Sequence, residues 1–359
     1  MYDLIICGAG PAGSTLAKFL GRDLRVLLLE KRALDRPHET GDAEKCCGGL
    51  LAPDAQRAFA ACGYALHQDV LAFPQTFLVR ALDLQSGISR AYQRHYINMN
   101  REAFDRFLFD KADVCEKRTG CVVKDVRRIP EGFEIEFVHG AGRCVEKGRM
   151  LACADGAGSI LRRKLDPKSE KTPLYAAIQQ EIALGAPEAF YGSYFDNTLT
   201  DYYAWTIPKD DAILFGAALA PGADAREKFE KFKARLIEKG VPLGGKVLAT
   251  HGALLRRPQR FSQIVPTKNG AFFLGECGGF VSPSSAEGLS YAIKTGRLCA
   301  QAILQSAGDR EKALRLYRRR CLPLQIKLAV KIVKGRVLYH PLMRSIAMAS
   351  GLTAIDTAQ

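Results

Sequence analysis

Long hydrophobic runs are missing from this chain of 359 residues. No window comes near the roughly 18 uninterrupted apolar residues that a membrane-spanning helix needs. Strand-like sequence begins at Tyr2, which leaves no room for a signal peptide behind Met1. We therefore expect a cytoplasmic protein. Its composition, 47% hydrophobic and 25% charged, is that of a globular protein, and its length suggests two domains.

Cysteine pairs with the spacing C-x-x-C are also missing, although the chain holds eleven cysteines. Their absence argues against zinc ribbons and dithiol redox motifs, and we expect no metal site. Cys7 and Cys153 lie at the ends of strand-like runs, where a thiol usually packs as a small buried hydrophobe. Reduced thiols in a reducing compartment fit this pattern best.

Acidic residues are too few to balance the basic ones, which leaves a formal net charge of +14. No helix-turn-helix, finger or stacking-aromatic motif accompanies this charge, so we expect no nucleic-acid partner. The excess is concentrated in "RLYRRRCLPLQIKLAVKIVKGRVLYHPLMRSIAMA", where basic and apolar residues alternate irregularly. This pattern suits a peripheral contact of residues 320–355 with an anionic membrane surface, or an acidic ligand. The simpler alternative is a solvated helix pair packed on the body of the protein.

A glycine-rich turn follows the first strand-like run. Tyr2–Cys7 predicts a buried parallel strand, Ser14–Gly21 predicts the helix after it, and the turn between them has the pattern G-x-G-x-x-G. Gly8 allows the tight turn, Gly10 lets the backbone approach a pyrophosphate, and Gly13 lets helix and strand pack closely. The N-terminus of the helix then offers N–H groups to the anion. The alternative is a glycine turn that packs only on itself.

A carboxylate lies at the end of the second apolar run, "LRVLLLE", which finishes at Glu30. In this position a carboxylate accepts hydrogen bonds from a ribose diol and repels a 2′-phosphate. The turn and Glu30 together therefore predict a bound dinucleotide other than NADP.

Two later blocks have the same strand–turn character. "MLACADGAGSILRRKL" places Asp155 and Gly156 after a strand, and "GAFFLGECGGFVSPSSAEGLSYAIKTGRLCAQAIL" predicts a strand, a glycine turn and a helix from about Ala286. The three blocks together resemble the FAD-binding domain of glutathione-reductase-like flavoproteins. The branch that they resemble contains aromatic hydroxylases, flavin halogenases and geranylgeranyl reductases. The resemblance covers nearly the whole chain.

This resemblance implies an α/β fold with FAD as the cofactor. Segments 1–60, 96–165 and 262–310 would form a discontinuous Rossmann-like FAD-binding domain. Segments 61–95 and 166–261 would form an inserted antiparallel-sheet α+β substrate domain, and 311–359 a C-terminal helical segment. By position, the residues expected at the cofactor are Gly8, Gly10, Ala12, Gly13, Glu30, Lys31, Arg101, Asp155, Gly156, Gly275, Glu276, Gly288 and Leu289.

Individual roles also follow from the resemblance. The three glycines of the first turn would face the pyrophosphate and Glu30 the adenosine ribose. Arg101 would lie near the phosphate-ribityl region, and Asp155 would mainly support the FAD fold. Glu276 stands where the family usually has an aspartate that contacts a ribityl oxygen.

The segment "YAWTIPK" is similar to the Y-x-W-x-F-P signature of geranylgeranyl reductases, with Ile207 where phenylalanine is common. Flavin halogenases have W-x-W-x-I-P, so Ile207 also resembles that group. Tyr203 and Trp205 are two apart on a strand and point to one face, where they would line an apolar pocket. The alternative is that both rings are simply core.

The stretch "GDAEKCCGGLLAP" predicts a loop that approaches the flavin, followed by a helix from Pro53. Geranylgeranyl reductases have a Cys-Gly segment in a similar place, so Cys46 or Cys47 would donate a proton or shape the cavity. A loop with buried thiols is the alternative. No halogenase-type lysine loop is matched, although Lys45 is near. The candidate catalytic residues are Cys46, Cys47, Tyr203 and Trp205.

These observations predict an FAD-dependent oxidoreductase that reduces carbon–carbon double bonds of a prenyl or other lipid-like apolar substrate. No second nucleotide turn is present, so the electrons would come from an external donor, either NAD(P)H or a redox protein. The alternatives are a flavin-dependent monooxygenase or halogenase that uses O₂, and a non-catalytic flavin-binding protein. We expect a cytoplasmic location, with the peripheral membrane contact as the open question.

Overall fold

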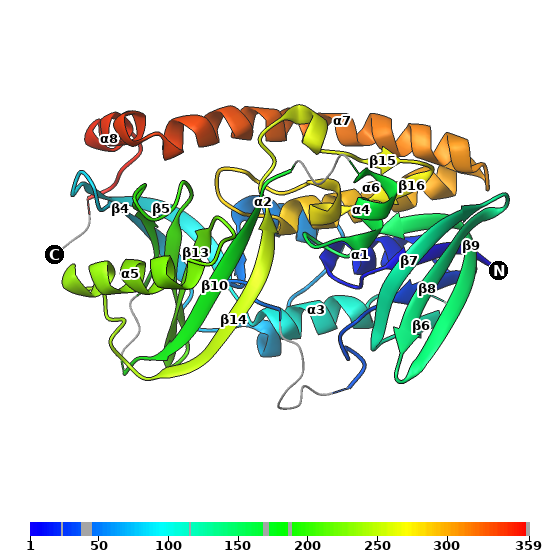
Figure 1. The fold of residues 1–359 in the computed structure, drawn as a ribbon, viewed down its shortest axis with the longest axis horizontal. Helices are drawn as coiled ribbons and strands as arrows, with labels where there is room; N and C mark the ends of the chain where they lie inside the picture. The colour runs from blue at the N-terminus through cyan, green and yellow to red at the C-terminus, as the bar shows by residue number, and fades with distance from the viewer. Residues whose placement is uncertain (23, 37–44, 115, 168–171, 186–188, 357–359) are drawn as a thin grey trace.

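Two β-sheets lie side by side along the longest axis of the protein (Figure 1). One long helix, α7 (Arg310–Tyr339), runs past both sheets. The structure is a computed structural model. It describes residues 1–22, 24–36, 45–114, 116–167, 172–185 and 189–356.

The centre of the first sheet is parallel and is built from strands that lie far apart in the sequence. Its order is β16-β9-β1-β2-β6, and each neighbouring pair is parallel. The bounds are Tyr2–Cys7 (β1), Val26–Leu29 (β2), Glu116–Arg118 (β6), Gly142–Cys153 (β9) and Ala271–Phe273 (β16). β1 and β2 are nearly continuous apolar runs, as expected of parallel strands covered on both faces.

Side chains of β1 alternate between two cores. Leu4 and Ile6 pack with α1 (Pro11–Leu20), α6 (Leu289–Ser306) and α7 on one face. Ile5 and Cys7 pack on the other face with the antiparallel strands β7 and β8 and with α4. The bounds of these three elements are Cys121–Ile129 (β7), Gly132–His139 (β8) and Ile160–Leu165 (α4). This three-layer arrangement leaves the carboxyl ends of the parallel strands open toward the second sheet, where ligands of such folds bind.

The second sheet has the order β14-β10-β13-β12-β11-β4-β5-β3. Its pairs are antiparallel apart from the parallel pair β11–β4. The bounds are Leu50–Leu51 (β3), Thr76–Asp83 (β4), Ser89–Asn98 (β5), Leu174–Ala183 (β10), Phe190–Phe195 (β11), Ala204–Lys209 (β12), Ala212–Leu219 (β13) and Val247–Arg256 (β14). Helix α5 (Ala225–Glu238) covers one face through Phe229 and Phe232. The other face carries an aromatic cluster that also includes Tyr339 of α7.

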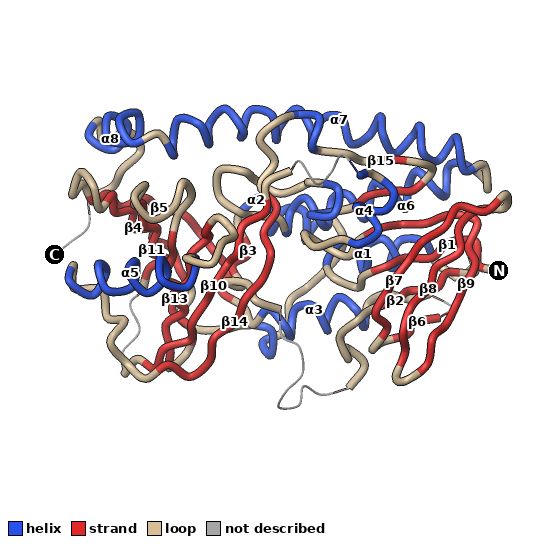
Figure 2. Tube along the Cα trace, viewed as in Figure 1, coloured by secondary structure: helices blue, strands red, loops and turns tan. Residues whose placement is uncertain are grey.

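Short elements complete the fold (Figure 2). They are α2 (Pro53–Ala60), α3 (Arg101–Asp110), α8 (Pro341–Ala349), β15 (Thr267–Lys268) and the 3-10 turns η1 (Gln68–Val70), η3 (Phe261–Gln263) and η4 (Gly275–Gly278). The side chain of Asn100 accepts a hydrogen bond from the N–H of Ala103 and so caps α3, which fixes the start of the helix at Arg101. No helix in the described ranges is both long and apolar enough to cross a bilayer.

The predicted α/β class is confirmed. Strands from the stretches 2–29, 116–153 and 267–273 share the first sheet, and strands from 50–98 and 174–256 share the second. The residue boundaries of the two domains stay a prediction. Residues 41–44 of the predicted cysteine loop, 168–171 and 186–188 of the predicted substrate domain and 357–359 of the C-terminal segment lie outside the described residues.

The start of α6 differs from the sequence-based expectation. A helix was expected from about Ala286, but α6 begins at Leu289. Ala286 has φ 54°, in the left-handed region, and the N–H of Ser282 donates to the carbonyl of Glu287. This turn ends only at Gly288, and its geometry depends on contacts that hydrophobic spacing does not encode.

Close contact between α1 and α6 depends on Gly296. A Cβ atom there would lie 2.4 Å from the carbonyl oxygen of Ala12. We predict that Gly296→Ala lowers the free energy of unfolding by about 1–3 kcal/mol, because both helices must shift apart. The urea midpoint of the purified protein measures the effect. Gly244→Ala, at an exposed glycine with open space around it, is the matched control; an equal shift in both variants would contradict the prediction.

Candidate functional site

The first glycine turn contains two kinds of glycine. Gly8 has φ 104°, and its Cβ would lie 2.4 Å from the carbonyl oxygen of Ala154; the Cβ of Gly13 would lie 1.9 Å from the carbonyl oxygen of Gly8. At these two positions a side chain would collide with the protein's own backbone, so both glycines are required by internal packing. Gly10 differs: its φ of −68° suits any residue, and apart from its chain neighbours no described heavy atom lies within 4 Å of its Cβ position. Gly10 lines a cavity, so its missing side chain leaves room for a ligand.

Glu30 lies at the same wall of the cavity, directly after β2. Its Oε2 accepts a hydrogen bond from the N–H of Ala9 at 2.7 Å, and its Oε1 accepts from the N–H of Arg32 at 3.0 Å. Arg32 Nε also donates to Oε1, so one of about four acceptor positions of the carboxylate is left for a ribose hydroxyl. Lys31 and Ala12 line the cavity beside it.

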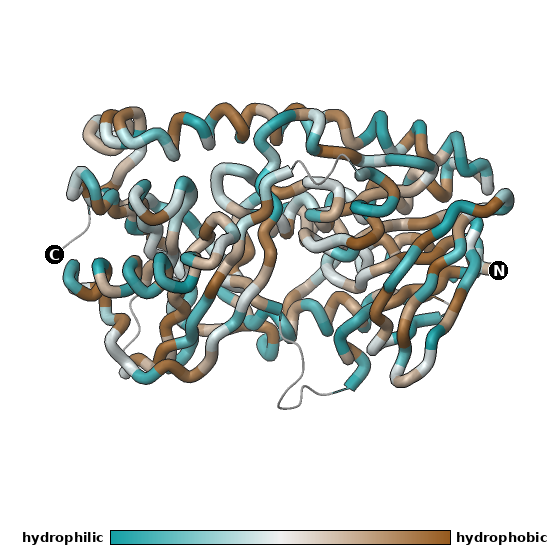
Figure 3. Tube along the Cα trace, in the orientation of Figure 1, coloured by the Kyte–Doolittle hydropathy of each residue, from teal (hydrophilic) through white to brown (hydrophobic). Residues whose placement is uncertain are grey.

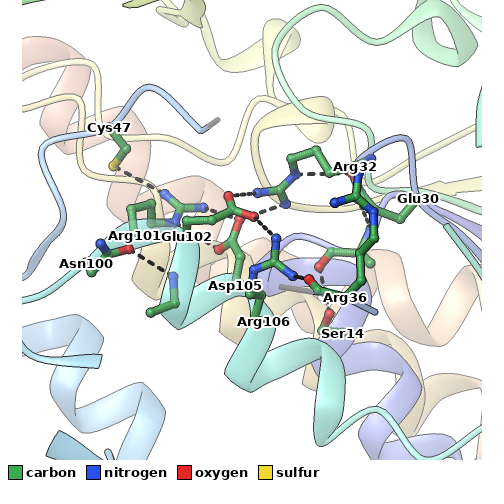
Figure 4. A network of polar contacts seen from close by, with 12 residues as sticks. Ser14, Glu30, Arg32, Arg36, Cys47, Asn100, Arg101, Glu102, Asp105 and Arg106 are labelled. Atoms are coloured by element: carbon green, nitrogen blue, oxygen red, sulfur yellow. Dashed lines mark hydrogen bonds and ion pairs between the residues drawn. The ribbon is translucent and has the colours of Figure 1, made fainter. Parts of the chain in front are cut away.

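A buried ionic chain leads from Glu30 to the cysteine loop (Figure 4). Arg32 donates to Glu30 at 3.2 Å and to Asp105 at 2.9 Å. Arg101 donates to the other oxygen of Asp105 at 2.9 Å and reaches Cys47 Sγ at 3.2 Å. Arg101 was predicted from the sequence, whereas Arg32 and Asp105 were not. The spacing of Asp105, one helical turn after Arg101, was the available signal.

Cys46 and Cys47 line the cavity but differ in their acid–base state. Burial raises the pKa of Cys46 to about 12, so this thiol keeps its proton at neutral pH. Burial acts in the same direction on Cys47, but the charge of Arg101 and the N–H of Gly49 outweigh it and lower the pKa of Cys47 below that of an ordinary cysteine.

The two glycines after the cysteines allow the loop to lie against β12. A Cβ at Gly48 would lie 2.3 Å from Ile207 Cδ1, and one at Gly49, where φ is 61°, 2.2 Å from the carbonyl oxygen of Met99. Lys209 Nζ donates to the carbonyl oxygens of Met99 at 2.7 Å and Gly49 at 3.3 Å, and to the side-chain oxygen of Asn98. Burial lowers the pKa of Lys209 to about 8. This lysine was not expected at the site.

The second and third sequence blocks form the cavity wall next to the first glycine turn, because Gly8 packs against Ala154 and Gly275 against Ala12. Asp155, Gly156, Gly275, Glu276, Gly288 and Leu289 all line the cavity. Glu276 Oε1 accepts the N–H of Arg256 at 2.8 Å. Asp155 Oδ1 is buried without a hydrogen-bond partner among the described residues, and burial raises the pKa of this carboxyl. The side chains of Ser159 and Cys277 also hydrogen-bond this carboxyl, so it interacts with the protein itself.

Tyr203 and Trp205 of β12 form the aromatic end of the cavity. Tyr203 donates its hydroxyl to the carbonyl of Ser285 at 2.9 Å, and the Trp205 indole N–H lies 3.4 Å from Gln179 Oε1. Gly216, opposite Trp205 on β13, makes room for the indole, because a Cβ there would lie 2.3 Å from the ring. Both rings are buried and also line the cavity, so the core and the pocket interpretations both apply.

One cavity of about 630 Å³ joins all these walls. Every predicted site residue lines it except Gly13, which lies beneath the turn. Their individual roles stay predictions. Leu338 and Tyr339 of α7 also line the cavity and had no sequence signal, because only the tertiary fold brings α7 there. Within the described ranges, no group of three His, Cys, Asp or Glu side chains could hold a metal ion.

Solved structures share this fold. A geranylgeranyl bacteriochlorophyll reductase-like protein from Thermoplasma acidophilum has a TM-score of 0.78 and 17% identity, covering 94% of this chain and 88% of the other. PqsL of Pseudomonas aeruginosa, described as a "probable FAD-dependent monooxygenase", has a TM-score of 0.70 and 21% identity, covering 98% and 99%. A flavin-dependent brominase has a TM-score of 0.68 and 19% identity, covering 98% of this chain and 94% of the other. The fold is therefore the one found in FAD-dependent and flavin-dependent enzymes.

Sequence relatives define the family. Protein CbrA of Escherichia coli O6:H1 is 37% identical over 355 residues, which cover 99% of this chain and 94% of the relative. Protein CbrA of Shigella sonnei is likewise 37% identical, covering 99% of this chain and 98% of that relative. The chain belongs to the CbrA family. No protein-family model matches it.

The two cysteines should differ in reactivity. We predict that iodoacetamide modifies Cys47 with a midpoint at lower pH than Cys46, as mass spectrometry of each site would measure. Arg101→Gln should slow the alkylation of Cys47 at pH 7 by about tenfold for each pKa unit that the thiol rises. Arg106→Gln, on the same helix but bonded to Glu102, is the matched control. Equal midpoints for both cysteines would refute this assignment.

Proposed function

We propose that this protein is an FAD-dependent oxidoreductase that reduces carbon–carbon double bonds of a prenyl or other lipid-like apolar substrate. The observation that carries the proposal is the single cavity, which has a dinucleotide-type turn at one end and aromatic rings at the other. The TM-score of 0.78 to the geranylgeranyl bacteriochlorophyll reductase-like protein supports it.

The chain's own residues fit FAD. Gly10 leaves space for a pyrophosphate at the N-terminus of α1, where N–H groups and the helix dipole favour an anion. Glu30 keeps one acceptor position for a hydroxyl of the adenosine ribose. Arg101, held by Asp105, adds a positive charge between these walls.

When bound and reduced, FAD supplies a hydride to one carbon of the alkene, and a proton must reach the other carbon. Cys46 is the candidate holder of that proton, because its thiol stays protonated at Sγ and lines the cavity. Cys47 has the lower pKa of the two thiols, because the Arg101 guanidinium lies 3.2 Å from its Sγ. NAD(P)H or a redox protein would return the two electrons from outside.

The aromatic end of the cavity positions the substrate and excludes water. Tyr203 and Trp205 are held by hydrogen bonds to Ser285 and Gln179, so their rings face the cavity in fixed orientations. Apolar walls exclude water from the reacting carbons and orient a chain-like substrate along the rings.

A second candidate is an FAD-dependent monooxygenase or a flavin-dependent halogenase. The observation that favours it is Lys45, which lines the cavity next to Cys46, together with the fold shared with PqsL and the brominase. In that case the reduced enzyme would react with O₂ before it met its substrate.

Oxygen separates the two candidates. We expect FAD-loaded protein, reduced with dithionite under argon, to be reoxidised by a polyprenyl alcohol in detergent, with a product two hydrogen masses heavier. Trp205→Ala should slow this reoxidation by about tenfold or more, since the ring orients the chain. Reoxidation that needs O₂ and yields an oxygenated or halogenated product would instead establish the second candidate.

A substitution at Gly10 tests FAD binding independently of the reaction. We predict that Gly10→Leu weakens FAD binding about a hundredfold, equivalent to about 3 kcal/mol, because the side chain enters the pyrophosphate space. Absorbance of gel-filtered protein measures bound FAD. The melting temperature of the FAD-free protein should not change, since the backbone angles and surroundings accept a side chain. Gly185→Leu is the matched control; full FAD binding by Gly10→Leu would contradict the assignment.

A further inference from the structure

The outer face of α7 carries an exposed row of apolar side chains. Its members are Leu322, Ile326, Val330, Val333 and Val337, each between 40% and 65% exposed. Their spacing of three or four residues places them on one face of the helix. Single exposed apolar residues are normal on a protein surface, but a continuous row of this length marks a contact site.

Exposed apolar residues also occur on α8. Leu342, Met343 and Ile346 of α8 are 63%, 45% and 58% exposed. α7 and α8 lie along one edge of the molecule (Figure 1), and apolar segments recur along that edge (Figure 3). We call the five residues of α7 and these three residues of α8 the outer ridge.

The opposite face of α7 is already packed. Tyr317, Cys321, Leu328 and Ile332 are buried in the core that covers the first sheet. The inner face therefore accounts for the docking of α7 on the protein. A helix that is apolar on both faces normally lies between two apolar environments. We therefore expect the outer ridge to contact a second apolar environment.

The segment that carries the outer ridge is strongly basic. Residues 312–355 contain four lysines, six arginines and no aspartate or glutamate. Arg315 and Arg319 are exposed and extend the row of α7 toward its N-terminus at the same spacing. Lys327, Lys334 and Arg336 are exposed along α7 as well. Long basic side chains beside an apolar row suit a surface with an apolar interior and anionic groups at its boundary.

We infer that the outer ridge is the surface through which this protein rests on an anionic lipid bilayer. Apolar side chains would enter the boundary of the acyl region while the lysines and arginines meet lipid phosphates. A symmetric pairing of two copies through this face would bring two strongly basic helices together, which like-charge repulsion disfavours.

The outer ridge also lies close in the chain to the cavity wall. Leu338 directly follows Val337 of the ridge, and Leu338 and Tyr339 line the cavity from α7. A lipid-like substrate would therefore have a short path from the bilayer to the aromatic rings. This last step rests on the proposed function, whereas docking on the bilayer does not, because vesicle binding is measured without turnover.

Flotation of the full-length, FAD-loaded protein with vesicles tests the docking surface. We expect binding to vesicles of phosphatidylcholine mixed with phosphatidylglycerol, weaker binding to phosphatidylcholine alone, and loss of binding at high salt. Val330→Asp with Val333→Asp should lower the partition coefficient about tenfold or more, since two apolar contacts are replaced by charges that the lipid repels. Arg315→Gln with Arg319→Gln should weaken binding to the anionic vesicles only.

Val145→Asp with Ile237→Asp is the matched control, at apolar residues 53% and 43% exposed on β9 and α5. It should bind vesicles as the unchanged protein does, and all variants should keep their FAD absorbance. Failure of the unchanged protein to float, or equal flotation of the ridge and control variants, would overturn the inference. So would a dimer, or a complex with an acidic protein, that Val330→Asp with Val333→Asp disrupts while vesicle binding is absent.

Discussion

Asp105 is the residue on which the geometry of the candidate site depends. Its two oxygens receive Arg32 and Arg101, each at 2.9 Å, and all three side chains are largely buried. Arg32 is tied to Glu30 at the end of the first sheet, and Arg101 to Cys47 in the loop that lies against the second sheet. The chain of ion pairs therefore links Glu30, near the first glycine turn, to the cysteine loop. Removing one partner of such a buried set typically costs about 3–5 kcal/mol, because the remaining charge stays buried.

Local patterns were enough to predict much of the fold. The strand expected at Tyr2–Cys7 has those bounds in the structure, and the helix expected from Pro53 begins there. These elements are set by short-range signals: an apolar run, a glycine turn, a proline at the first helical position. The start of α6 at Leu289 escaped prediction, because the turn before it is set by the conformation of Ala286 and by a hydrogen bond from Ser282 to Glu287.

The residues of the candidate site likewise divide into those with a local signal in the sequence and those without one. Gly8, Gly10 and Glu30 were predicted from one contiguous stretch, since their spacing along a strand and a turn has a direct geometric meaning. Lys209 and Tyr339 were not predicted, because each reaches its place through contacts between distant segments. The lowered pKa of Cys47 could not be predicted either, since it depends on Arg101, more than fifty residues away in the chain.

The central claim is that one cavity holds FAD with its ring beside Tyr203 and Trp205. An experimental structure of the purified protein with FAD tests it most directly. We predict density for the pyrophosphate at Gly10, for the adenosine ribose at Glu30, and for the isoalloxazine ring beside Tyr203 and Trp205. Density elsewhere, or none at saturating FAD, would contradict it.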